Sequence, residues 1–111
     1  MIKTATTGTL KHGLKIGETF HKDFEFKTDI TAGDYFLAEE AIGAKGTLRF
    51  DAELVARQLV RIGTFTGPFS ADLLATLKTS DMNALMRRRE LLEAEGNAEP
   101  SGEPTSSPEK P

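Results

Sequence analysis

Histidine, cysteine and paired carboxylates are the side chains best suited to catalysis or metal binding. The chain has two histidines, His12 and His21, and it has no cysteine, so thiol nucleophiles and thiolate metal ligands are excluded. No carboxylate pair accompanies the histidines at a metal-ligand spacing. We therefore expect two exposed strand histidines rather than a metal site, and we predict a protein that is not an enzyme and needs no cofactor.

Two further segments contain residue types that could bind an anionic group. Gly43-Ala44-Lys45-Gly46-Thr47 is similar to a phosphate-binding loop, but it lacks the full glycine-lysine-serine/threonine spacing, so a plain loop between helices is favoured. Arg87-Arg88-Arg89 is the only basic run. On a helix, successive residues point about 100° apart, which predicts a solvated face rather than one basic surface, with Arg89 in reach of Glu93. A contact with an acidic partner is the alternative.

Composition separates a domain from a tail. The chain has 111 residues and a formal net charge of −3. Residues 96–111 contain four of the five prolines and little that could be buried, so we predict a domain over residues 1–95 and a disordered tail over 96–111. The slightly acidic balance argues against nucleic acid as a partner. No stretch is long and apolar enough to cross a membrane, and the first residues lack an export signal.

Apolar and polar residues alternate between residues 4 and 29, which predicts two strands. Gly17-Glu18 separates them and suits a type II′ hairpin turn, so positions whose numbers sum to about 35 should pair. Gly8 and Gly13 are candidate positions for bulges or a bend in the first strand. One face of this hairpin should carry the apolar residues Leu10, Leu14, Ile16, Phe20, Phe24 and Phe26.

Helical periodicity begins after the hairpin. Helices are predicted over 32–42, over 52–62, in a short stretch after Ser70, and over 81–95. Their predicted N-caps are Thr31 (with Asp34 reaching back), Asp51, Ser70 and Ser80, and Gly43 and Gly63 should end the first two helices. The predicted fold class is α+β, an N-terminal β-hairpin packed on a bundle of three to four short helices.

Four apolar residues have two interpretations. Phe65 and Phe69 flank the Gly67-Pro68 turn, and they either staple the loop onto the core or form an anchor for a partner. Met82 and Met86 recur at helical spacing, and they belong either to the core or to an adaptable binding surface.

The order of these segments resembles the Mu-like phage tail assembly chaperones over roughly residues 10 to 95. The segments that carry the resemblance are Thr31-Ala32-Gly33-Asp34, Leu54-Val55-Ala56-Arg57-Gln58-Leu59, the turn Gly63–Phe69, Leu73–Leu77 and Ser80–Leu85.

The resemblance implies a non-catalytic protein that binds the phage tape-measure protein, and possibly the tail-tube protein, in the host bacterial cytoplasm. It implies absence from the mature virion, and self-association is possible. Phe65, Phe69, Met82 and Met86 are then the candidate partner-binding residues. Two alternatives are a small structural tail or baseplate protein and an unrelated protein-binding module.

Overall fold

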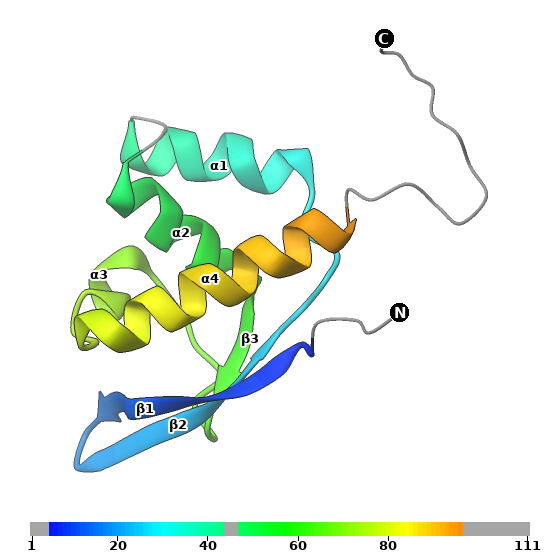
Figure 1. Cartoon of the computed structure of the whole chain (residues 1–111). Coiled ribbons are helices and arrows are strands. Elements are labelled where there is room, and N and C mark those ends of the chain that lie inside the picture. The colour runs from blue at the N-terminus through cyan, green and yellow to red at the C-terminus, as the bar shows by residue number, and fades with distance from the viewer. Residues whose placement is uncertain (1–4, 44–46, 97–111) are drawn as a thin grey trace, which may run out of the picture.

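A three-stranded antiparallel sheet lies beside a layer of helices in the computed structural model, which describes residues 5–43 and 47–96 (Figure 1). The elements in chain order are β1 (Thr7–Ile16), β2 (Thr19–Phe26), α1 (Ala32–Ile42), α2 (Leu48–Gln58), β3 (Leu59–Ile62), α3 (Ala71–Leu74) and α4 (Thr79–Gly96). The predicted α+β class is therefore confirmed, and a third strand is added to the hairpin. The predicted tail lies outside the described residues except for Gly96.

The hairpin between β1 and β2 turns at Gly17-Glu18, as predicted. Leu14 pairs with His21 and Ile16 pairs with Thr19, which is the predicted register near the turn. Gly17 has φ 63°, and no non-glycine residue in the described ranges has a positive φ, as expected for a turn that begins with glycine.

The first strand is interrupted between Thr9 and Leu14, where its register against β2 shifts. Gly13, inside this bulge, has φ 100°, which confirms the prediction of a bulge there. The same prediction for Gly8 is wrong. Gly8 pairs regularly with Phe24, and its hydrogen side chain leaves room for the Phe24 ring, which a β-carbon would approach to 2.5 Å.

Helix α1 has the predicted bounds and caps. Thr31 and Asp34 form a capping box, in which the Asp34 carboxylate accepts a hydrogen bond from the Thr31 backbone N–H at 2.9 Å. Gly43 ends the helix with φ 85°, and its N–H donates to the carbonyl oxygen of Glu39.

The second predicted helix, 52–62, is wrong at both ends. Helix α2 begins at Leu48, because the Thr47 hydroxyl, and not Asp51, accepts the capping hydrogen bond from the Phe50 N–H at 3.0 Å. The chain leaves the helix at Leu59, and Leu59–Ile62 forms β3 against β2. A two-stranded hairpin is marginal alone, so pairing with β2 outweighs one more helical turn.

Side chains of the sheet and of three helices form the main core. Leu10, Leu14, Phe24 and Phe26 pack with Val55, Leu59, Ile62, Leu74, Leu85 and Leu92. A second cluster, Ala38, Phe50 and Leu54, lies between α1 and α2. Phe20 was predicted on the core face, but it is 57% exposed. It pairs with exposed Lys15, and cross-strand partners share a face, so Phe20 lies on the solvent side of the hairpin end.

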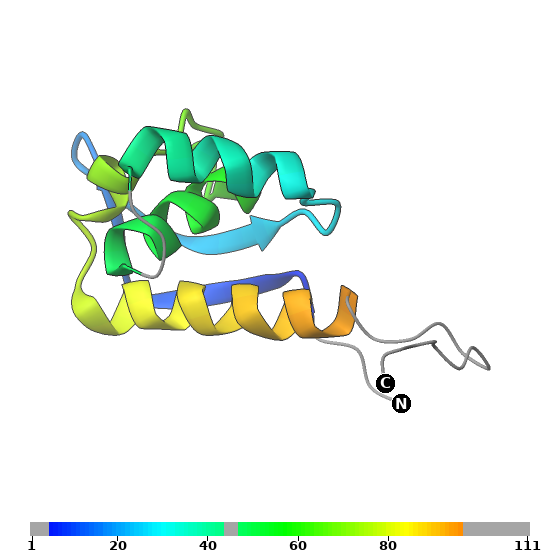
Figure 2. The same ribbon diagram turned by 90° about the horizontal axis from the view of Figure 1, so that it is seen from above.

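Helix α4 runs along β1 across the molecule, as Figure 2 shows from above. It begins at Thr79, so Ser80 lies inside the helix and is not its cap, contrary to prediction. Asp81, in the first turn, is 1% exposed and accepts hydrogen bonds from the backbone N–H groups of Lys11, His12 and Gly13 at 2.9, 3.0 and 2.8 Å. This carboxylate therefore satisfies the amides that the bulge removes from the β-ladder.

Candidate functional site

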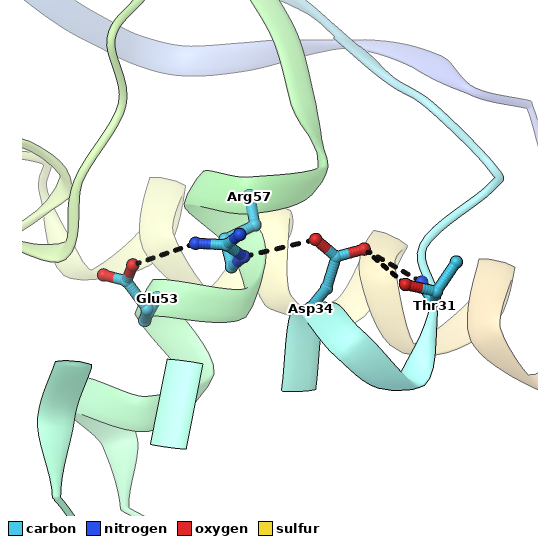
Figure 3. Close-up of polar contacts among 4 residues, drawn as sticks. All are labelled: Thr31, Asp34, Glu53 and Arg57. Carbon is cyan, nitrogen blue, oxygen red and sulfur yellow. Dashed lines mark hydrogen bonds and ion pairs between the residues drawn. The ribbon is translucent and has the colours of Figure 1, made fainter. Parts of the chain in front are cut away.

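A chain of polar contacts joins α1 to α2 (Figure 3). The Asp34 carboxylate lies 3.3 Å from the Arg57 Nε, and the Arg57 guanidinium lies 4.0 Å from the Glu53 carboxylate. The hydrogen bond from the Thr31 backbone N–H is the main reason that the pKa of Asp34 lies below its usual value, and Arg57 lowers this pKa further. Partial burial opposes both effects. Because each charge has an opposite charge beside it, this cluster positions α1 on α2 and leaves no activated acid or base.

The described residues contain no group of three histidine, cysteine or carboxylate side chains that could hold a metal ion. His12 is exposed, whereas His21 is half-buried and its Nδ1 accepts a hydrogen bond from the Thr64 N–H at 3.4 Å. Within the same ranges, no helix is long and apolar enough to span a bilayer. Several large apolar side chains of the described residues are exposed, among them Phe36, Leu37 and Leu48.

The four predicted partner-binding residues are all half-buried against the main core. Phe65 and Phe69 contact each other edge to face, with ring centroids 5.3 Å apart. Met82 and Met86 lie on α4 and pack against the same core cluster. Each residue thus contributes to the core with one side and reaches the surface with the other.

Met82 also lines an apolar groove of about 420 Å³ between α2, α3 and the start of α4. Its apolar lining includes Leu48, Ala52, Leu74 and Leu77. Leu48 is 65% exposed, and Arg49 at the same edge forms an ion pair with Asp72. Sequence reasoning missed Leu48 because the predicted helix began after it. Thr47, a good N-cap residue directly before Leu48, was the feature of the sequence that could have indicated the earlier helix start.

The arginine run does not form the solvated face that was predicted. Only Arg87 is exposed. Arg88 donates to the carbonyl oxygens of Ala5 and Thr7 at 2.9 and 2.6 Å. Arg89 is 6% exposed, and its guanidinium lies 2.8 Å from the Glu93 carboxylate, which confirms the predicted ion pair. The prediction failed because two of the three arginines turn toward β1 and α1.

The outward side of α1 carries large apolar side chains that are exposed to solvent. Phe36 is 68% exposed and Leu37 is 48% exposed. This surface could not be predicted, because α1 has apolar residues on all sides and so no periodicity that separates a buried stripe from an exposed one.

The described residues thus form a small α+β domain with exposed apolar side chains on its helices. Residues 10–102 match the family described as "Tail assembly protein gp41". The chain is 32% identical over 88 residues to the "Mu-like prophage FluMu protein gp41" of Haemophilus influenzae, with 68% of each chain covered. No solved structure matches. The chain therefore belongs to the Mu-like phage tail assembly protein gp41 family, which confirms the resemblance seen in the sequence.

Proposed function

We propose that this protein is a non-catalytic tail assembly chaperone that binds the tape-measure protein of its phage or prophage. The observation that supports this most is the apolar groove between α2, α3 and α4, which leaves Leu48 and Met82 available to a partner. A groove of this kind suits the apolar stripe of an amphipathic helix. Methionine adapts to varied side chains, so one groove could cover successive segments of a long helical protein.

The proposal includes the place and timing of the function. The chaperone covers apolar stripes of the tape-measure protein in the host cytoplasm, leaves as the tail tube polymerises, and is absent from the mature virion. The tail-tube protein is a second partner of the proposal.

The experiment is co-expression of the full chain with the tape-measure protein encoded beside it. We expect a higher soluble yield of the tape-measure protein and co-purification of the two proteins. Leu48→Ser should weaken the association, because it removes an exposed apolar side chain at the groove. Val60→Ser is the matched control, because Val60 is 40% exposed on β3. Failure of the folded wild-type protein to bind would refute the proposal.

Phe65→Ala tests the anchor predicted from sequence. If Phe65 and Phe69 contact the partner, this variant should bind more weakly than wild type, at a melting temperature that shows an intact fold. Binding at the wild-type level would restrict the contact to the groove.

A structural role in the tail is the competing function. Purified phage particles separate the two, since a chaperone should be missing from them. A stoichiometric amount of the chain in washed particles would establish the structural role and exclude the proposed one.

A further inference from the structure

Helix α1 exposes one continuous side to solvent. Residues three or four apart share a helix face, and Gly33, Phe36, Leu37, Glu40 and Ala41 are all exposed. The opposite side of the helix is the packed one: Ala38 is buried with the α2 side chains of the second core cluster. Phe36 and Leu37 together form an apolar patch on this face, and exposed apolar patches mark contact surfaces.

The charged residues of α1 and of the segment before it are all acidic, and of these Asp34 is paired with Arg57 of α2. Between residues 28 and 43 there are four acidic residues, Asp29, Asp34, Glu39 and Glu40, and no lysine or arginine. A second copy of this chain seated on the same face would bring Glu40 against another acidic helix. A partner that carries lysine or arginine beside its apolar residues is complementary.

A cavity of about 350 Å³ adjoins the N-terminal end of the face. Ala32 and Tyr35 of α1 line it, and Ala32 lies one helical turn before Phe36. Across the cavity are the Glu93 side chain of α4 and Gln58 of α2. The cavity thus continues the α1 face toward the C-terminal end of α4, opposite to the end where the apolar groove lies (Figure 1).

Hydrogen-bond acceptors are available at this cavity. Gln58 is 1% exposed, and its Nε2 donates to the Lys27 carbonyl oxygen at 2.8 Å, which fixes the orientation of the carboxamide. Its Oε1 has no hydrogen-bond partner among the described residues. Glu93 neutralises Arg89 and keeps its side chain 34% exposed. A donor at the end of a long side chain fits these groups better than another carboxylate would.

We propose that the α1 face (Phe36, Leu37 and Glu40) and this cavity together bind a basic amphipathic helix of the tape-measure protein. The apolar stripe of that helix covers Phe36 and Leu37, and a lysine or arginine beside the stripe reaches the acidic groups at Glu40 and the cavity. This inference rests on the proposed function and adds a charge-selective contact to the apolar groove.

The test measures the affinity of the purified full chain for the tape-measure protein. The variant is Phe36→Ser combined with Leu37→Ser, which alters only exposed positions. It should bind about tenfold or more weakly. Leu91→Ser with Val60→Ser is the matched control, because both residues are about as exposed as Leu37 but lie on α4 and β3, and it should bind like wild type.

Charge is tested separately. Glu40→Lys should weaken binding and should make it less sensitive to salt, whereas Glu90→Lys on α4 should change both less. The melting temperature of each variant, measured in parallel, confirms that the fold is intact. If wild type binds and the α1 variants bind equally well, the inference is overturned and the proposed function stands. If wild type itself does not bind, the proposed function fails.

Discussion

Asp81 is the residue that joins the first turn of α4 to the bulge of β1. Burial raises the pKa of this carboxyl, but hydrogen bonds from the backbone N–H groups of Gly13, Lys11 and His12 outweigh that effect, and the pKa lies below its usual value. The charged form is therefore the one that the fold stabilises.

Asp81→Asn should lower the free energy of unfolding by about 2–4 kcal/mol, because the amide offers one acceptor oxygen to three backbone donors and adds a donor of its own. Urea denaturation at neutral pH measures this. Asp72→Asn is the control: Asp72 has an 80% exposed side chain paired with Arg49, so its loss should cost less than about 1 kcal/mol. Equal effects of the two substitutions would contradict this role of Asp81.

The effect of Asp81→Asn should also depend on pH. An aspartate whose folded pKa is lowered contributes stability above its unfolded pKa of about 3.9, and this contribution is lost as pH falls through the folded pKa. The stability difference between wild type and variant should thus be full above about pH 5 and shrink below about pH 4. Asp34, whose pKa is also lowered, is present in both proteins and cancels in the difference.

Contacts of this kind could not be predicted from sequence. Asp81 and its three donors are 68 to 70 residues apart, and no local pattern connects them. The aspartate was instead read as part of an ordinary helix start. For Arg89, the ion pair with Glu93 could be predicted because the two residues are four positions apart. Its hydrogen bond to the Tyr35 hydroxyl depends on how α1 packs on α4 and could not be predicted.

At the scale of elements, turns and helix caps could be predicted from sequence where the residues that form them are close together in the chain. The hairpin turn, the Thr31–Asp34 cap and the Ser70 cap depend on residues within four positions of each other, and all three are present. The boundary between α2 and β3 was missed because Leu59 and Ile62 lie three residues apart, which fits a helix as well as a bulged strand. Pairing with Phe24 and Phe26 decides between these, and it is a long-range contact.

Phe24→Ala and Leu59→Ala should each lower the free energy of unfolding by about 2–5 kcal/mol, because both side chains belong to the core where β2 meets β3. Phe24 is 2% exposed and Leu59 is 7% exposed. Phe20→Ala, at the exposed end of the same strand as Phe24, should cost less than about 1 kcal/mol. Chemical denaturation of the three variants tests this, and a large effect at Phe20 would place it in the core after all.

At the scale of the whole molecule, the domain boundary near residue 95 remains a prediction. Leu92, near the end of α4, is 7% exposed and belongs to the main core, and Glu93 holds Arg89. A chain truncated after Glu95 should therefore melt within about 2 °C of the full chain. A chain truncated after Glu90 loses both contacts and should melt clearly lower. A large effect of the first truncation would show that residues beyond 95 stabilise the domain.

The contacts of Arg88 and Asp81 with β1 also determine how the sheet can meet other chains. A free strand edge with unpaired N–H and C=O groups is a template for strand addition and aggregation. The carbonyl oxygens of Thr7 in β1 and of Ala5 just before it accept hydrogen bonds from Arg88, and the amides of the bulge donate to Asp81. The opposite edge strand, β3, has four residues, and its last residue, Ile62, already bridges to Phe65. These contacts occupy edge groups of the sheet that an added strand would need, so they protect the sheet from extension by another chain.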